Sequence, residues 1–352
     1  MVTSASTPEK APPPPADPPD RLRVAVVGTG SIGERHLRCF QATGRAEVIA
    51  CEPNPDLGHA VVERYACPWF TTLEEAVAAQ PEEKPIDAAI LCTPAHLHIP
   101  LARQYVEAGL HLLIEKPLAV SEEGIPLLQQ AARERERVVR VAYTLRSHPV
   151  YQRLKQRLGE IGEPRQWVST HGQHFPTFRP AYRDIYYARH ASGGGAIQDA
   201  LTHNLHAAEW LLGPFASIMA DADHLVLEGV EVEDCVHLSG RMAGGVLASF
   251  ALNQFQAPNE TYVTIHGTTG SLRADLGRLR VGLFRHGDDD WCWEALPAIE
   301  RDEIFIRQAH SFLDALHGLP DTLATLEEGH QTLKVNLAAL EAVRTRREVT
   351  LS

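Results

Sequence analysis

The sequence has 352 residues, which at about 150 residues per domain indicates two domains. It carries 33 basic and 45 acidic residues, for a formal net charge of −12. This excludes a general nucleic-acid or anionic-membrane binder, which needs a basic face. Hydrophobic residues make up 44% and charged residues 22%, and these ordinary globular values exclude wholesale disorder. The six cysteines form no C-x-x-C pair, which favours free thiols over disulfides or a zinc site.

The first 20 residues consist mostly of proline, alanine, serine and charged residues. Such a segment cannot bury enough apolar surface to offset its ordering entropy, so we expect a disordered tail over 1–20. The segment lacks the hydrophobic stretch of a secretory signal, and no apolar run in the chain approaches the roughly 18 residues of a membrane span. We therefore expect a cytoplasmic protein with no membrane partner.

Short apolar runs rich in β-branched residues alternate with helical patterns in the first part of the chain. The runs lie at 22–27, 46–51, 87–92, 111–114 and 138–143. Strands that alternate with helices of roughly 10–15 residues indicate βαβ units and a parallel sheet. We expect a Rossmann-type dinucleotide-binding domain over 21–145, and so an α/β protein.

The pattern changes after about Arg146. One long helical stretch at 194–212 precedes several strand candidates in succession, with glycine turns between some of them. These candidates lie at 217–228, 233–242, 245–256, 260–266, 269–275 and 278–285. Neighbouring strands of this kind predict an α+β domain with an open, mostly antiparallel sheet over 146–320. Helices are expected over 303–317 and 322–346.

The letters G-T-G-S-I-G at 28–33 match the G-x-G-x-x-G pattern, and they follow a strand and open a helix. The first glycine permits a tight turn, the second lets a pyrophosphate approach, and the third lets the helix pack on the strand. The helix N-terminus adds N–H donors for phosphates. The residues expected to bind a cofactor here are Gly28, Gly30, Ser31, Ile32 and Gly33. The alternative is a plain glycine-rich turn.

Glu52 follows the second strand, 24 positions after Gly28. A carboxylate there can accept hydrogen bonds from both ribose hydroxyls of an adenosine and would repel a 2′-phosphate. No arginine stands in the P-N-P-D segment that follows at 53–56. We therefore expect NAD as the cofactor, with NADP less favoured. The alternative is a solvated glutamate.

Three further segments carry a family resemblance: C-T-P-A-H-L-H at 92–98, E-K-P at 115–117, and G-G-G-A-I-Q-D-A-L-T-H at 193–203. Together with the fingerprint, this ordered set resembles the glucose-fructose oxidoreductase, inositol dehydrogenase and rhizopine-catabolism (Gfo/Idh/MocA) family over roughly 21–350. The resemblance implies a homo-oligomer formed through the second domain's sheet, and a last helix, within 321–352, that returns to the Rossmann domain. It also implies redox chemistry at a secondary alcohol of a sugar, cyclitol or nucleotide sugar.

Hydride transfer from an alcohol requires that the hydroxyl proton leave and that the alkoxide be stabilised. Lys116 lies just past a parallel strand, where such sheets bind ligands, and can stabilise this oxygen. His203 titrates near neutrality, and Asp199, four positions earlier, can orient it or pair with Lys116. The resemblance implies that Lys116, Asp199 and His203 form the catalytic set. The alternatives are a solvated lysine and a structural histidine.

The remaining expectations concern the pocket. Thr93, Pro94, His98 and Glu115 are expected on the cofactor side, and His98 could instead face the substrate. The segment 171–190 is rich in Arg, His and Tyr, which bind hydroxyls and carboxylates, unless it is an interface arm or a loop tied by salt bridges. Expected substrate contacts are Lys116, Arg146, His148, His174, Arg179, Tyr182, Arg183 and His203.

The letters H-N-L-H at 203–206 stand where many relatives carry acidic residues, so no particular substrate is carried over from the family. Asp199, His203 and His206 could also be read as a metal cluster, but no further ligand is evident, and no metal is expected. Two other functions remain open. One is a redox-neutral glycosidase or lyase that oxidises a sugar transiently with NAD. The other is a non-catalytic NAD-binding regulatory subunit.

Overall fold

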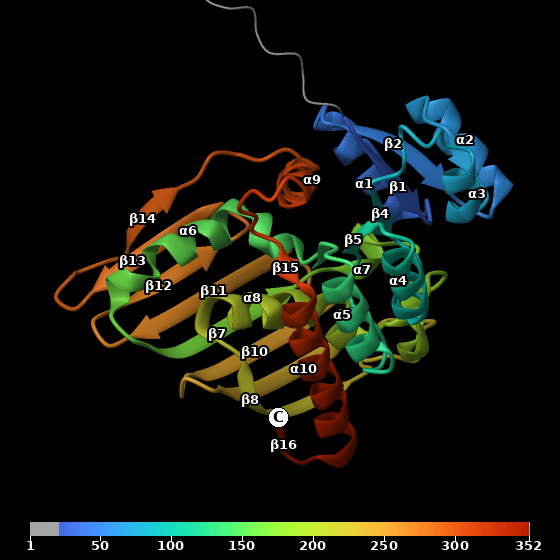
Figure 1. The fold of residues 1–352 in the computed structure, drawn as a ribbon. Helices are drawn as coiled ribbons and strands as arrows, with labels where there is room; N and C mark the ends of the chain where they lie inside the picture. The colour runs from blue at the N-terminus through green and yellow to red at the C-terminus, as the bar shows by residue number, and fades with distance from the viewer. Residues whose placement is uncertain (1–20, 352) are drawn as a thin grey trace, which may run out of the picture.

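The computed structural model describes residues 21–351, so the expected disordered tail at 1–20 lies outside the described residues. Two sheets lie side by side, and helix α10 runs along the boundary between them (Figure 1). Within this described part of the chain, no helix combines the length and hydrophobicity needed to cross a membrane.

Sheet A has seven strands in the order β15-β6-β5-β4-β1-β2-β3. Its strands are β1 (Leu22–Val27), β2 (Ala46–Cys51), β3 (Trp69–Phe70), β4 (Ala88–Leu91), β5 (His111–Ile114), β6 (Val139–Val141) and β15 (Ala324–Thr325). All pairs are parallel except that of β15 with β6. Every residue of β4 is buried, as expected for a central parallel strand covered on both faces. The predicted parallel Rossmann sheet is confirmed.

Helices connect the parallel strands. They are α1 (Ser31–Ala42), α2 (Pro55–Tyr65), α3 (Leu73–Ala78), the short turn η1 (Ala95–Leu97), α4 (His98–Glu107) and α5 (Ile125–Glu134). The turn η2 (Thr144–Ser147) follows β6 and leads into the second sheet's region. Because the strands are parallel, their carboxyl ends share one edge, and the loops after β1, β4 and β5 meet there.

Sheet B has nine strands in the order β14-β13-β12-β11-β7-β10-β9-β8-β16. Its strands are β7 (Pro164–Gly172), β8 (Phe215–Asp223), β9 (Cys235–Met242), β10 (Leu247–Asn253), β11 (Glu260–Gly267), β12 (Gly270–Asp275), β13 (Arg280–Arg285), β14 (Cys292–Ala295) and β16 (Val349–Thr350). All pairs are antiparallel except β7 with β10, so the mostly antiparallel sheet is confirmed. The predicted strand 217–228 ends earlier, at Asp223.

One face of sheet B is covered by helices that share its hydrophobic core. The elements of this half are α6 (Pro149–Arg157), η3 (Leu158–Ile161), α7 (Phe175–Phe178), η4 (Tyr186–Ala188), η5 (His190–Ser192), the π-helix η6 (Ala196–Leu201) and α8 (Thr202–Leu212). The single helix expected over 194–212 is therefore a π-helical turn followed by an α-helix. Such insertions are rare and are often found at functional sites.

The last two helices connect the halves. Helix α9 (Glu303–Leu316) packs on the sheet A side, where Ala309, Phe312 and Leu313 join the core around β1, although the sequence analysis assigned 146–320 to the second domain. Helix α10 (Leu326–Thr345) begins with a capping box and serves both sheets. Its first turns contribute Leu326 and Leu333 to the core of sheet A, and later residues join the core of sheet B.

Candidate active site

The glycine-rich loop after β1 has the shape that its three glycines allow. Gly28 has a φ of +86°, and a Cβ on it would lie 3.1 Å from the Cys92 carbonyl oxygen. A Cβ on Gly33 would lie only 1.8 Å from the carbonyl oxygen of Gly28, so the first turn of α1 packs directly on the loop. By contrast, a Cβ on Gly30 would meet nothing within 4 Å. The loop therefore leaves open space beside Gly30, where a phosphate can approach the backbone.

Glu52 lies beside this loop at the end of β2 and is buried. Its Oε2 accepts hydrogen bonds from the backbone N–H of Thr29 at 2.7 Å and from the Thr29 hydroxyl at 3.2 Å. Its Oε1 accepts from the backbone N–H of Asn54 at 3.0 Å. Oε2 thus accepts two hydrogen bonds and Oε1 only one, so the acceptor capacity left for a ribose hydroxyl lies mainly on Oε1. The structure thus brings Glu52 to the loop, as expected.

The ring of His98, expected on the cofactor or substrate side, lies between two backbone carbonyls. Its Nδ1 lies 3.1 Å from the Pro117 carbonyl oxygen and its Nε2 lies 2.8 Å from the Thr93 carbonyl oxygen. Burial lowers the pKa of this histidine, and a neutral ring carries one N–H, so it donates to one of the two carbonyls and faces the other. His98 therefore braces the loop after β4 against the loop after β5. Pro94 opens turn η1, and the buried Thr93 hydroxyl has no partner among the described residues.

Glu115 is buried at the end of β5 and is fixed through both of its oxygens. Its Oε1 lies 2.7 Å from Nε2 of His36, a buried residue of α1, and its Oε2 accepts from the backbone N–H of Lys116 at 3.0 Å. Although burial alone would raise it, the pKa of Glu115 is lowered by His36 and Lys116. The pair connects the helix that follows the glycine loop to Lys116. His36 was not predicted from the sequence, in which the only feature that points to it is its position on α1.

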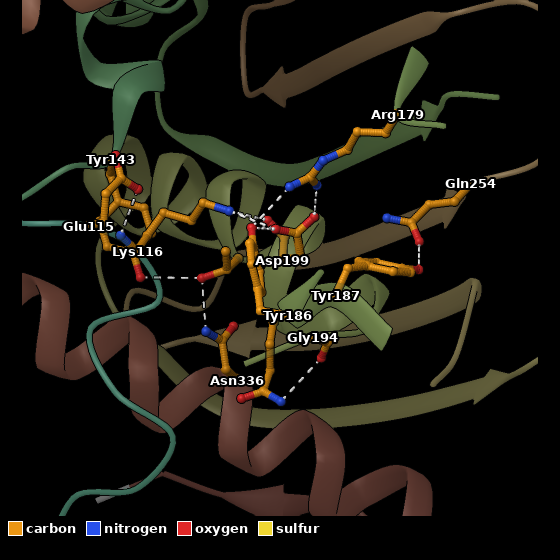
Figure 2. Close-up of polar contacts among 12 residues, drawn as sticks. Glu115, Lys116, Tyr143, Arg179, Tyr186, Tyr187, Gly194, Asp199, Gln254 and Asn336 are labelled. Carbon is orange, nitrogen blue, oxygen red and sulfur yellow. Dashed lines mark hydrogen bonds and ion pairs between the residues drawn. The ribbon is translucent and has the colours of Figure 1, made fainter. Parts of the chain in front are cut away.

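Three side chains converge on the carboxylate of Asp199 (Figure 2). The Lys116 ammonium donates to its Oδ1 at 3.0 Å and to its backbone carbonyl at 2.8 Å. The Tyr186 hydroxyl donates to Oδ1 at 2.5 Å, and the Arg179 guanidinium donates to Oδ2. Arg179 also donates to the Tyr186 hydroxyl at 3.1 Å. The loop after β5 in sheet A is therefore tied to the π-helical turn in the other half.

This arrangement fixes the charges of the cluster. Although burial alone would raise it, the pKa of Asp199 is held far below its usual range by Lys116 and Arg179. Burial alone would also lower the pKa of Lys116, but Asp199 overcomes that effect and raises it. Asp199 thus faces two cations, Lys116 and Arg179, and a positively charged donor at Lys116 suits an oxygen bearing negative charge.

His203 begins the first turn of α8, and its Nδ1 is buried without a partner in the described part of the chain. Burial lowers the pKa of His203 to about 3, and Lys116 contributes in the same direction. The imidazole is therefore neutral near pH 7 and can accept a proton. No hydrogen bond joins it to Asp199 among the described residues. Of the two expected roles of Asp199, the structure shows the pairing with Lys116.

Arg146, an expected substrate contact, bonds to residues of α8 and α10 and of the segment before β15. Its Nε donates to Nε2 of His206 at 2.8 Å, and its Nη1 donates to the Leu323 carbonyl at 3.1 Å. Its Nη2 pairs with Glu328 at 2.5 Å. The guanidinium is buried between the two halves, and His206 is engaged by it rather than by Asp199 or His203.

Two further expected substrate contacts are structural. His148 is buried and caps α6, because its Nδ1 accepts from the backbone N–H of Val150 at 3.2 Å. Tyr182 is buried in a small aromatic cluster, and its hydroxyl donates to the Glu228 carbonyl at 3.0 Å. Both residues therefore have a structural partner within the protein, and their contact with a substrate stays a prediction. Sequence alone gives no sign of this, since both residues suit a sugar pocket.

The two other expected substrate contacts of the segment 171–190, His174 and Arg183, lie in different surroundings. His174 precedes α7, and its Nδ1 lies 2.8 Å from the Thr177 hydroxyl. Arg183 is exposed and lines, with Tyr186, a surface hollow of about 410 Å³. The sequence analysis named Arg179 but missed Tyr186, although the repeated tyrosines beside it were part of the same polar segment.

Comparisons with known proteins agree with this architecture. Residues 22–143 match the family described as "Oxidoreductase family, NAD-binding Rossmann fold", and residues 151–273 match its "GFO/IDH/MocA C-terminal domain". The chain belongs to the Gfo/Idh/MocA oxidoreductase family. It is accordingly an NAD-binding dehydrogenase or reductase, and the family expectation is confirmed.

Relatives match over nearly the whole chain. Levoglucosan dehydrogenase of Pseudarthrobacter phenanthrenivorans is 25% identical, with 91% of this chain and 96% of the relative covered. 1,5-Anhydro-D-fructose reductase of Ensifer adhaerens is 27% identical, with 92% and 96% covered. A solved structure of levoglucosan dehydrogenase in complex with NADH and levoglucosan shares the fold with a TM-score of 0.84 at 22% identity, covering 94% of this chain and 99% of that one.

Proposed function

We propose that this oxidoreductase interconverts a secondary hydroxyl and a ketone on a sugar, a cyclitol or a close derivative, with NAD as its redox partner. Relatives with near-complete coverage are named as a levoglucosan dehydrogenase, a 1,5-anhydro-D-fructose reductase and, from Rhizobium meliloti, an inositol 2-dehydrogenase. The compounds in these three names are all polyhydroxylated rings. The polar, cationic character of the cluster around Asp199 suits such a substrate.

The residues at the edge of sheet A fit NAD. The open space beside Gly30 would take the pyrophosphate, Glu52 would hold the adenosine ribose, and the unpartnered Thr93 hydroxyl offers a further polar contact. Ser31 and Ile32 would contribute the N–H groups at the start of α1. When bound, NAD supplies the acceptor or donor of the hydride.

The residues around the reacting carbon would divide the remaining work. Lys116, kept charged by Asp199, would donate a hydrogen bond to the substrate oxygen and stabilise its negative charge. His203, kept neutral, would accept the hydroxyl proton during oxidation and return it during reduction. Asp199 would hold Lys116 in place, with Arg179 and Tyr186 securing the carboxylate from the other side.

One observation carries this proposal: the bond between Lys116 of one half and Asp199 of the other, four positions before His203. It brings a charged donor and a neutral acceptor to one place, and an alcohol oxidation needs both.

The test is to screen purified protein with NAD against cyclitols, anhydrosugars, sugars, sugar acids and nucleotide sugars, and to measure NADH at 340 nm. NADH formation with at least one ring alcohol, lost in Lys116→Ala, is expected.

The same screen addresses the other two functions. Cleavage of a nitrophenyl glycoside without net NADH would replace the proposal with a redox-neutral enzyme. A protein that binds NADH but turns over no ring alcohol or glycoside would be a regulatory subunit. The presence of Lys116, Asp199 and His203 together favours turnover over a purely regulatory role.

We also propose that the protein is a cytoplasmic homo-oligomer. The six cysteines are all unpaired, which suits a reducing compartment. Met219 is 55% exposed and Leu247 is 48% exposed. The register of the strands places both side chains on the face of sheet B that lies away from the helices. Analytical ultracentrifugation should show a dimer or larger. A Met219→Glu, Leu247→Glu double variant should then be monomeric.

A further inference from the structure

A buried polar network lies behind His203, where three segments from distant parts of the chain meet. Its members come from the end of β6 and the following turn, from α8 and from α10. We call it the junction, and it comprises Tyr143, Arg146, Thr202, His206, Thr332 and Asn336. All six residues are buried. Figure 2 shows part of it, with Asn336 of α10 reaching the same oxygen as Tyr143.

Only one assignment of donors and acceptors is consistent with the two hydrogen bonds of His206. An arginine Nε always donates, so Nε2 of His206, 2.8 Å from Arg146 Nε, must be an acceptor. Burial, with a contribution from Arg146, keeps the pKa of His206 well below its usual value, so the ring is neutral. Its single proton then lies on Nδ1 and is donated to the Thr332 hydroxyl at 2.8 Å. Thr332 donates onward to Glu209 at 2.8 Å.

The imidazole of His206, fixed in this way, supports the ring of Tyr143. Tyr143 stacks on His206 with a centroid separation of 4.0 Å and an interplanar angle of 10°. The hydroxyl of Tyr143 lies 3.2 Å from that of Thr202, which also accepts from Asn336 at 2.8 Å. Tyr143 in turn meets the ring of His203 at 88°, with a centroid separation of 6.1 Å. The position of His203 therefore depends on Tyr143, and that of Tyr143 on His206.

We propose that His206 is a positioning residue for His203, acting through the stacked ring of Tyr143 and held in one tautomer by Arg146 and Thr332. Lys116 and His203 come from different halves of the chain. A second connection besides the Lys116–Asp199 bond is needed to fix their separation, because two groups joined at one point can still rotate about it. The junction supplies that connection. The inference rests on the proposed function of His203.

The direct test is histidine ¹⁵N NMR of the full-length protein, with His203→Asn and His206→Asn used to assign signals. We expect His206 as the neutral Nδ1–H tautomer, and in Thr332→Val we expect the His203 resonances to shift. Thr332→Ser, which keeps the hydroxyl, should restore the wild-type spectrum. A protonated His206, or the Nε2–H tautomer, would overturn the proposal. So would unchanged His203 resonances in Thr332→Val.

Kinetics give a second readout. Thr332→Val should lower kcat about tenfold while the NADH dissociation constant stays within about twofold, because small displacements of a catalytic group are costly. The matched control is Thr264→Val, a buried threonine of sheet B whose hydroxyl accepts from Arg273. Equal loss of kcat in both variants, or none in Thr332→Val, would contradict the proposal. If Thr332→Val does not fold, His206→Phe keeps a ring against Tyr143 but removes both hydrogen bonds of the imidazole, and it should also shift the His203 resonances; unchanged resonances would contradict the proposal. The spectra are independent of turnover, so they separate a failure here from a failure of the proposed function.

Discussion

Two buried carboxylates, Glu52 and Asp199, are held in opposite ways. Glu52 accepts from the backbone N–H groups of Thr29 and Asn54 and has no cationic partner among the described contacts. Asp199 is surrounded by Lys116, Arg179 and Tyr186. Backbone donors fix the orientation of a carboxylate but leave its charge uncompensated, which suits binding of neutral hydroxyls. Cations compensate the charge and are themselves held in place, which suits stabilisation of a reacting oxygen.

The largest effect should follow removal of the carboxylate that is surrounded by cations. Asp199→Asn leaves Lys116 and Arg179 without their countercharge, so we expect kcat to fall by about 10³-fold and the free energy of unfolding to fall by about 3 kcal/mol. Turnover assays and urea denaturation measure the two effects. Asp275→Asn, at a buried carboxylate paired with Arg280 in sheet B, should lose stability but keep its kcat. A kcat loss of similar size in both would mean that the Asp199 effect is one of folding.

The next effect concerns the two groups that Asp199 brings together. Lys116→Ala and His203→Ala should each lower kcat by about 10²-fold, as is usual for a lost charge stabiliser or general base. Binding of NADH, followed by its fluorescence, should change little in either variant. Lys116→Arg keeps the charge and should recover part of the rate. Normal turnover in one of the alanine variants would remove the role assigned to that residue.

A smaller effect is expected at the carboxylate held by the backbone. Glu52→Ala should weaken NAD binding by about 10-fold, because the ribose contacts and the anchoring of the Thr29 and Asn54 N–H groups are lost together. It should also reduce the preference for NAD over NADP, since the negative charge that repels a 2′-phosphate is gone. Glu47→Ala, on the same strand but half exposed, serves as the control. An unchanged ratio of NAD to NADP affinity in Glu52→Ala would contradict the ribose assignment.

The smallest expected change is in the pH dependence. In the folded protein, His203 takes up a proton only near pH 3, well below the value of about 6.5 for a free histidine. As the pH falls from 7 to 5, His203 therefore stays neutral and kcat/KM should not decline through its titration. Initial rates across this range test the point. A decline centred near pH 6.5 that disappears in His203→Asn would show that the imidazole titrates normally.

Local patterns were sufficient to predict the fold and the first half of the site. The Gly28 fingerprint, the strand before it and Glu52 lie within a single βαβ unit, and their spacing specifies their geometry. Lys116, Asp199 and His203 were named because of the family resemblance, and the structure places Lys116 against Asp199. Of the two roles offered for Asp199, the structure shows the pairing with Lys116, and the π-helical turn that carries Asp199 has no residue pattern that predicts it.

Four of the expected pocket residues share one feature that the sequence does not reveal. Arg146, His148, Tyr182 and His98 are residue types that suit a pocket, and each instead satisfies a buried backbone or side-chain partner. Which partner a polar side chain takes depends on contacts between segments far apart in the sequence, such as that of Arg146 with α8 and α10. The same long-range contacts explain why His36 and Tyr186 were missed.

The most direct test of the central claim is a crystal structure with NADH and a ring alcohol found by the screen. The account predicts that Lys116 Nζ and a ring nitrogen of His203 both lie within about 3.2 Å of the oxygen on the carbon that faces C4 of the nicotinamide. A complex in which either group lies beyond about 5 Å from that oxygen, with no water between them, would contradict it.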